Sequence, residues 1–143
     1  MKLLVTGGAG FIGSNFVHYT LSHRPEYDIT IIDKMTYAGN LGNLSSVQDK
    51  ITFVEGDICD AELMDRLVGE TDIVVHFAAE SHNDNSIRNP RPFLDTNIVG
   101  TYTILEAVRK HDKRLHHIST DEVYGALEIT DSEGIESPFT TKA

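Results

Sequence analysis

The sequence predicts a doubly wound α/β fold, in which helices cover both faces of one parallel β-sheet. Short apolar runs rich in β-branched residues alternate with segments of helical periodicity along the chain. The strand-like runs are almost entirely apolar, as expected for a parallel sheet that is buried on both faces. The 143 residues fit one domain that can bury a sizeable core.

Five apolar segments are predicted to be strands: Lys2–Thr6, Asp28–Asp33, Ile51–Glu55, Asp72–His76 and Arg114–Ser119. Three segments between them have the apolar spacing of helices: Phe11–His23, Ala61–Val68 and Arg91–Lys110. In the longest of these helices we expect a buried stripe made by Ile98, Tyr102, Leu105 and Val108. Residues 35–46 are rich in Gly, Asn and Ser and are predicted to form a loop with at most a short helix.

A glycine-rich loop follows the first predicted strand and opens the first predicted helix. Residues 8–13, GAGFIG, have the pattern G-x-G-x-x-G, and Gly7 adds an overlapping glycine. Such glycines allow a tight turn, the close approach of a pyrophosphate and close contact between helix and strand. The pyrophosphate would meet free N–H groups at the positive end of the helix dipole. The loop is typical of Rossmann-type dinucleotide-binding domains, although glycines also serve ordinary turns.

Further candidates for a dinucleotide site follow the other strands, because ligands of such sheets bind at the carboxyl ends of the strands. Asp33 ends the second strand 20 residues after Gly13, the spacing of an acid that binds the adenosine ribose hydroxyls. A carboxylate there disfavours a 2′-phosphate, so NAD is predicted rather than NADP. Asp57 and Ile58 either flank the adenine or form a plain turn. The alanines of Phe77-Ala78-Ala79 either let the cofactor pass closely or pack in the core.

Composition excludes several other classes of protein. The formal net charge of −10 argues against nucleic-acid and anionic-membrane binding, since both need positive fields. A single cysteine, Cys59, makes an internal disulfide impossible, and no segment is apolar and long enough for a signal peptide or membrane span. The seven histidines lack the spacing of metal ligands, so no metal site is predicted. We expect a cytoplasmic protein.

Six quoted stretches together resemble one family. TGGAGFIGSNF, DKMTYAGN, GDI, FAAESHNDNSI, TNIVGTYTILEA and HISTDEVYG are similar to the nucleotide-sugar 4,6-dehydratases of the extended short-chain dehydrogenase/reductase superfamily. The resemblance runs from residue 1 to about residue 125. TYAGN, AAESH and STDEVYG are far more specific than the glycine loop, which the whole superfamily shares.

The resemblance implies a set of site residues. The residues expected to contact NAD are Gly7, Gly10, Phe11, Ile12, Gly13, Asp33, Lys34, Met35, Thr36, Asp57, Ile58, Phe77, Ala78, Ala79 and Thr96. Ser81 and Thr120 would contact the sugar of a nucleotide-sugar substrate. Asn83 and Asn85 depart from the aliphatic residue and the arginine that are usual in the family.

The adjacent acids Asp121 and Glu122 are implied to be the catalytic pair. Once NAD⁺ has oxidised the C4 hydroxyl of the glucose, its C5 proton lies next to a carbonyl and becomes acidic. Glu122 would remove that proton as base, Asp121 would protonate the departing C6 hydroxyl as acid, and hydride would return to C6. Two close carboxyl groups favour one charged and one neutral form, as this step requires. The alternative is a solvated acidic turn.

The oxidation step of the superfamily uses a Tyr-x-x-x-Lys pair, which this sequence lacks: no tyrosine has a lysine four residues later. Members of the family are also more than twice as long, with a C-terminal substrate domain that is absent from this chain, and they form homodimers. We therefore interpret residues 1–143 as an apparently incomplete Rossmann-type NAD-binding domain. Two other functions stay open, a nucleotide-sugar 4-epimerase and a non-catalytic NAD-binding module.

Overall fold

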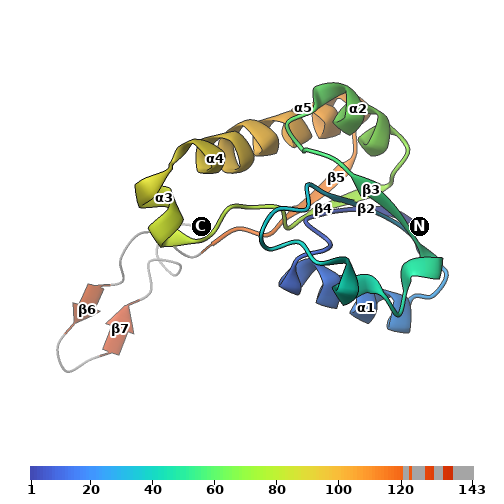
Figure 1. Cartoon of the computed structure of the whole chain (residues 1–143), viewed down its shortest axis with the longest axis horizontal. Coiled ribbons are helices and arrows are strands. Elements are labelled where there is room, and N and C mark those ends of the chain that lie inside the picture. Colours follow the sequence, from blue (N-terminus) through green and yellow to red (C-terminus); the bar gives the residue numbers. More distant parts are fainter. Residues whose placement is uncertain (121–122, 124–127, 131–133, 137–143) are drawn as a thin grey trace.

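The computed structural model describes residues 1–120, 123, 128–130 and 134–136 (Figure 1). Its centre is a parallel sheet of five strands in the order β3-β2-β1-β4-β5. The strands are β1 (Lys2–Thr6), β2 (Asp28–Asp33), β3 (Ile51–Glu55), β4 (Ile73–His76) and β5 (Arg114–His117). The chain reverses its direction of winding between β1 and β4, which is where ligands bind in such sheets. The predicted doubly wound fold is confirmed.

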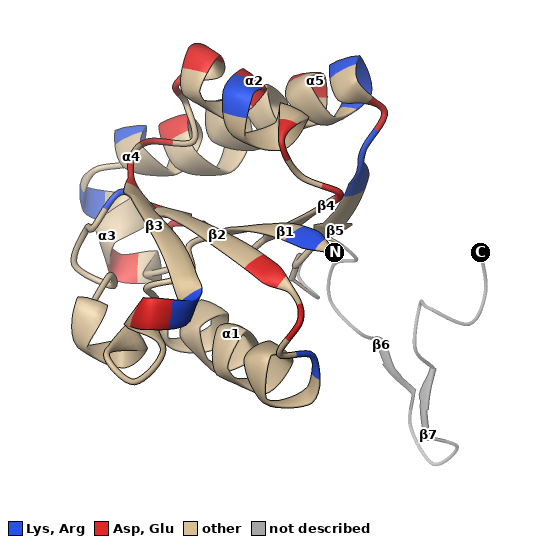
Figure 2. Cartoon of the chain, turned by 90° about the vertical axis from the view of Figure 1, so that its right-hand side faces the viewer, with Lys and Arg blue, Asp and Glu red and all other residues tan. Residues whose placement is uncertain are grey.

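Helices cover both faces of the sheet (Figure 2). On one face lie α1 (Phe11–His23) and the short 3-10 turns η1 (Leu41–Leu44) and η2 (Gln48–Lys50). On the other face lie α2 (Ala61–Gly69) and α5 (Thr101–His111), which pack side by side. Asp60 caps α2 and accepts hydrogen bonds from the backbone N–H groups of Glu62 and Leu63.

Each face of the sheet has its own buried core. Leu3, Val5, Ile29 and Ile31 pack against Val17 of α1 in the first core. The second core contains Leu4 of β1, Ile32 of β2 and Val74 of β4. They pack with Met64 of α2 and Ile104 of α5. Alternate residues of a strand point to opposite faces, so the central strands must be apolar throughout.

The predicted stripe on the long helix is wrong at three of its four positions, and only Val108 packs against the second core. Ile98, Tyr102 and Leu105 are exposed, whereas Ile104 and Ala107 are buried in the second core. The helix is built as α4 (Arg91–Phe93), a π-helical segment η3 (Leu94–Gly100) and α5. Three of the four predicted positions lie in α5 itself, where Ile104 and Ala107 form the buried face, so the predicted stripe has the wrong phase around the helix.

The sequence pattern did not predict two further features, the helix α3 and a separate pair of strands. The helix α3 (Asn83–Arg88) has no buried residue, so it carries no apolar periodicity. Beyond the main sheet, β6 (Glu128–Thr130) and β7 (Gly134–Glu136) form an antiparallel pair.

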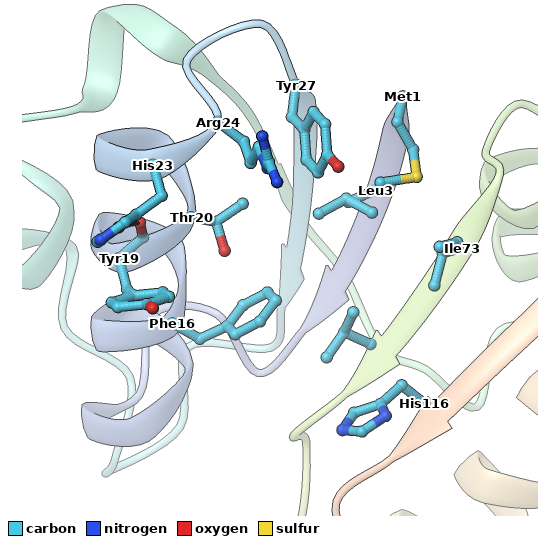
Figure 3. Close-up of a pocket in the computed structure, with 11 residues that line it drawn as sticks. Met1, Leu3, Phe16, Tyr19, Thr20, His23, Arg24, Tyr27, Ile73 and His116 are labelled. Atoms are coloured by element: carbon cyan, nitrogen blue, oxygen red, sulfur yellow. Dashed lines mark hydrogen bonds between the residues drawn. The ribbon is translucent and has the colours of Figure 1, made fainter.

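One face of β4 and β5 is open on the side of α1. A groove of about 710 Å³ lies there, between Phe16, Tyr19 and His23 of α1 and Ile73 and His116 of the sheet (Figure 3). None of the residues that line it belongs to the glycine loop, residues 7–13.

Candidate functional site

The glycine loop lies at the carboxyl end of β1, where it is packed too closely for side chains. Gly7 has a φ of +70°, and a Cβ built on it would lie 2.7 Å from the backbone nitrogen of Ala78. A Cβ on Gly13 would collide with the carbonyl oxygen of Gly7 and lie 2.9 Å from the Cα of Gly8. Gly7 therefore needs glycine for its turn, and Gly13 needs it for the contact between helix and loop.

The amino-terminal turn of α1 is open. Gly10 is its N-cap residue, and no side chain caps the first backbone N–H groups of the helix. Phe11 is 81% exposed and Ile12 is 64% exposed, so two large apolar side chains stand beside these N–H groups. Unfilled N–H donors beside apolar surface suit a phosphate attached to a flat organic group.

Asp33 ends β2 and faces the glycine loop. Its Oδ2 accepts a hydrogen bond from the backbone N–H of Ala9 at 3.0 Å, and its Oδ1 accepts one from the N–H of Met35 at 3.0 Å. Met35 has a φ of +55°, so the chain turns sharply away from the strand there. The carboxylate thus holds the glycine loop to the end of β2, a role that the spacing rule alone does not reveal.

Lys34 and Asp57 join the ends of β2 and β3. Lys34 Nζ lies 2.6 Å from Asp57 Oδ2, and Asp57 Oδ1 accepts a hydrogen bond from the N–H of Cys59 at 2.9 Å. Burial acts to raise the pKa of the Asp57 carboxyl, but the bonds from Lys34 and Cys59 outweigh it and the pKa is lowered. The adjacent Ile58 is only 5% exposed and belongs to the second core.

The segment after β2 lies over the glycine loop. The backbone N–H of Asn40 and the Nδ2 of Asn43 both donate to the carbonyl oxygen of Ala9, at 3.1 and 3.0 Å. Tyr37, in the loop after β2, interacts with Glu80, in the loop after β4. Its partial burial and the Glu80 carboxylate both raise the pKa of its phenol. The loops after β1, β2 and β4 are therefore joined to one another, and Thr36, in the loop after β2, is exposed.

The loop after β4 is tied to η3 by a residue that the sequence analysis missed. Asn97 Oδ1 accepts from the N–H of Glu80 and its Nδ2 donates to the carbonyl oxygen of Glu80, both at 2.8 Å. This pair holds Glu80, and with it the loop of Ala78 and Ala79, to η3, which also contains Thr96. No sequence signal identifies Asn97. It lies in a π-helical segment, and such segments are frequent at functional sites but are not revealed by the sequence.

The predicted substrate residues are less completely placed. Ser81 and Thr120 are exposed, after β4 and after β5 respectively. The predicted acids Asp121 and Glu122 lie outside the described residues. Within residues 1–120 and the other described positions, no group of three His, Cys, Asp or Glu side chains could hold a metal ion. In that same part of the chain, no helix is long and apolar enough to cross a membrane.

The family described as GDP-mannose 4,6 dehydratase matches residues 4–141. The chain belongs to this family. It is 63% identical over 131 residues to a dTDP-glucose 4,6-dehydratase of Mycobacterium tuberculosis, covering 92% of this chain and 40% of the relative. It is 48% identical to dTDP-glucose 4,6-dehydratase 1 of Escherichia coli, covering 99% of this chain and 44% of the relative. The resemblance to nucleotide-sugar 4,6-dehydratases is confirmed, over about two fifths of the relatives' length.

Solved structures give the same result. DesIV, a dTDP-glucose 4,6-dehydratase from Streptomyces venezuelae with NAD and TYD bound, matches with a TM-score of 0.84 and 44% identity, covering 97% of this chain and 47% of that one. A UDP-glucose 4-epimerase from Thermotoga maritima with UDP-glucose matches with a TM-score of 0.79 and 29% identity, covering 97% and 46%. The fold is thus shared by both enzymes, and the sequence is more similar to the dehydratase.

Proposed function

We propose that this chain is the NAD-binding part of a dTDP-glucose 4,6-dehydratase. The observation that carries the proposal is the joining of three loops at the winding reversal: the glycine loop, the segment after Asp33 and the loop of Ala78 and Ala79. Relatives of the same family have NAD bound in their structures. The activity named for those relatives supplies the reaction.

The residues of the site fit NAD. The uncapped turn at Gly10–Gly13 would bind the pyrophosphate. The exposed side chains of Phe11 and Ile12 would pack against apolar parts of the dinucleotide. Each carboxylate oxygen of Asp33 accepts one hydrogen bond from a backbone N–H group. Each oxygen has a second lone pair that can accept from a ribose hydroxyl. The Lys34–Asp57 pair would border the adenine. Titration with NAD and NADP tests this: we expect tighter binding of NAD, and clearly tighter binding of NADP contradicts it.

The chemistry that bound NAD supplies is reversible hydride transfer. The chain would contribute the proton transfers, with Glu122 as base at C5 and Asp121 as acid at C6 of the sugar. Ser81 and Thr120 would hold the sugar after β4 and β5. In the complete gene product, Asp121→Asn and Glu122→Gln should leave NAD binding and C4 oxidation intact and abolish water loss. If either variant still dehydrates the sugar, these two roles are wrong.

We expect the 143-residue chain alone to bind NAD weakly and to turn over no sugar. It lacks the Tyr-x-x-x-Lys pair that the family uses for oxidation. The alignment with the Escherichia coli relative spans 160 positions, more than the 143 residues of this chain, so the relative has residues without a counterpart inside the matched region. Formation of a 4-keto sugar by the 143-residue chain would contradict this expectation.

A nucleotide-sugar 4-epimerase is the second candidate, favoured by the likeness to solved 4-epimerases. Such an enzyme has no need of the Asp121–Glu122 pair. The product separates the two candidates, because a 4-keto-6-deoxy sugar absorbs in alkali and an epimer does not. A non-catalytic NAD-binding module would instead give neither product from the complete gene product.

We also propose a homodimer in the cytoplasm. Leu94, Ile98, Tyr102 and Leu105 are about half exposed or more and lie at helical spacing on the outer side of η3 and α5, as in a helix-to-helix interface. Ile98→Lys combined with Tyr102→Lys should convert a dimeric gene product to monomer in sedimentation. Lys substitution at the exposed Tyr19 of α1 is the control and should leave the dimer intact.

A further inference from the structure

A buried histidine lies where two of the three loops of the proposed NAD site begin, at the ends of β1 and β4. His76 ends β4, is 1% exposed and stands opposite Thr6, the last residue of β1, in the register of the two strands. Its Nδ1 lies 2.7 Å from the hydroxyl of Thr6, which is itself fully buried. Its Nε2 lies 3.0 Å from the hydroxyl of Thr101, the first residue of α5. The imidazole therefore bridges β1, β4 and the end of η3.

One tautomer of the neutral His76 ring satisfies the hydrogen bonds of this cluster. The Thr6 hydroxyl accepts from the backbone N–H of Ala78 at 3.2 Å, so its own proton is free to be donated to Nδ1 of His76. Nε2 then carries the proton of the neutral ring and donates it to Thr101. This arrangement satisfies every polar atom of the cluster. In this arrangement the ring is neutral, with Nδ1 as the acceptor and Nε2 as the donor.

Thr6 and Ala78 are the neighbours of the close glycine contact. Gly7 directly follows Thr6, and its backbone lies against the backbone of Phe77 and Ala78. The bond from Ala78 to Thr6 sets this contact, and His76 sets the orientation of the Thr6 hydroxyl. Thr101 lies one turn after Asn97, which holds Glu80. One imidazole thus orders the glycine loop, the Ala78–Ala79 loop and η3 together.

We propose that His76 is a positioning residue for the dinucleotide: its Nδ1, through Thr6, holds the glycine loop and the Ala78–Ala79 loop at the separation that NAD binding needs. The proposal rests on the proposed function. No atom of His76 reaches the surface to touch the cofactor, so its effect must pass through Thr6 and Thr101. The histidine of the neighbouring strand, His117, lies with its ring centre 5.0 Å away and is the other titratable group against this ring.

Two pairs of substitutions in the complete gene product test this proposal, with the dissociation constant of NAD as the readout. His76→Leu removes both ring nitrogens, whereas His76→Asn places a carbonyl oxygen near Nδ1 that can still accept from Thr6. Thr6→Val removes the hydroxyl at nearly constant shape, whereas Thr6→Ser keeps it. We expect His76→Leu and Thr6→Val to weaken NAD binding about tenfold or more, the loss of one or two hydrogen bonds. His76→Asn and Thr6→Ser should stay within about threefold of wild type, a difference of less than one such bond.

Thr71→Val is the matched control for loss of stability. Thr71 is also buried, and its hydroxyl donates to the carbonyl oxygen of Lys2 at the opposite end of the same strands. The Thr71→Val variant should lower the melting temperature as Thr6→Val does. It should change the dissociation constant of NAD by less than about twofold. Equal weakening by Thr71→Val and Thr6→Val, or wild-type affinity in a folded His76→Leu, overturns the proposal.

The outcomes also separate this inference from the proposed function. If the wild-type protein binds no NAD, the proposed function fails and takes this inference with it. If the wild type binds NAD and all four variants bind it equally well, the proposed function stands and only the positioning role is wrong. Should His76→Leu fail to fold, the Thr6→Val and Thr6→Ser pair still decides.

Discussion

The central strand β1 and the edge strand β5 each lead into a part of the proposed active site, yet they are supported very differently. Every residue of β1 after Lys2 is buried, and the loop that follows is held by Asp33, Asn40 and Asn43. In β5 only Leu115 packs against a core, and one face of the strand borders the groove beside α1 (Figure 3). The cofactor side is therefore built by contacts within this chain, whereas β5 depends on what covers its open face.

The largest predicted effect is at Gly13, on the side of β1. Gly13→Ala brings a Cβ into the carbonyl oxygen of Gly7 and against Gly8, with only backbone to give way. We expect unfolding free energy to fall by roughly 3 kcal/mol or more and NAD binding to be lost. Denaturant titration and NAD binding measure the two effects.

Gly10→Ala and His116→Ala are the controls for that result. A Cβ on Gly10 would meet one atom, the Gly7 carbonyl oxygen at 3.3 Å, so it should weaken NAD binding more than stability. His116 is exposed on β5, and its truncation should change stability by less than about 0.5 kcal/mol. A His116→Ala effect as large as that of Gly13→Ala would remove the contrast between the two strands.

The second prediction concerns the stability of the fold at acid pH. Burial lowers the pKa of His76 to about 4, with His117 adding to the effect, whereas an unfolded histidine titrates near pH 6.5. Between these values the unfolded chain binds a proton that the folded chain excludes, so stability falls as the pH drops from about 6.5 toward 4. The full loss is about 3 kcal/mol.

Urea unfolding at pH 7, 6 and 5 measures this slope, which His76→Asn should flatten. The carboxylates of Asp57 and Asp65 have lowered pKa values, so they lose their contribution only below about pH 4. A slope between pH 6.5 and 5 that persists in His76→Asn would assign it to another group.

The third prediction separates the two roles of Asp33. Asp33→Asn puts an amide N–H opposite the backbone N–H of either Ala9 or Met35, so one bond becomes a clash of donors. We expect a loss of about 1–3 kcal/mol in unfolding free energy and a lower preference for NAD over NADP. An unchanged cofactor preference would show that Asp33 serves only the loop.

The predictability of this structure follows the same division. Strands β1, β2 and β3 and helix α1 have the predicted bounds. In β1 and β2 the reason is burial on both faces, which requires a nearly continuous apolar run in the sequence. The stripe on the long helix was mispredicted because Tyr102 and Leu105 have the same spacing as Ile104 and Ala107, and spacing alone does not tell which pair faces the core. The position of Asp33 was predictable from spacing, but its bonds to Ala9 and Met35 were not, since they depend on loop conformation.

The smallest predicted effect is at the Lys34–Asp57 pair, between the ends of β2 and β3. The Lys34 side chain is 56% exposed, so its pair with Asp57 is screened by solvent despite the 2.6 Å distance. Lys34→Ala should therefore change unfolding free energy by less than about 1 kcal/mol. Asp57 also holds the N–H of Cys59, so Asp57→Ala should cost more than Lys34→Ala. Equal effects of the two variants, measured by thermal unfolding, would mean that the ion pair rather than the turn at Asp57 holds this edge of the site.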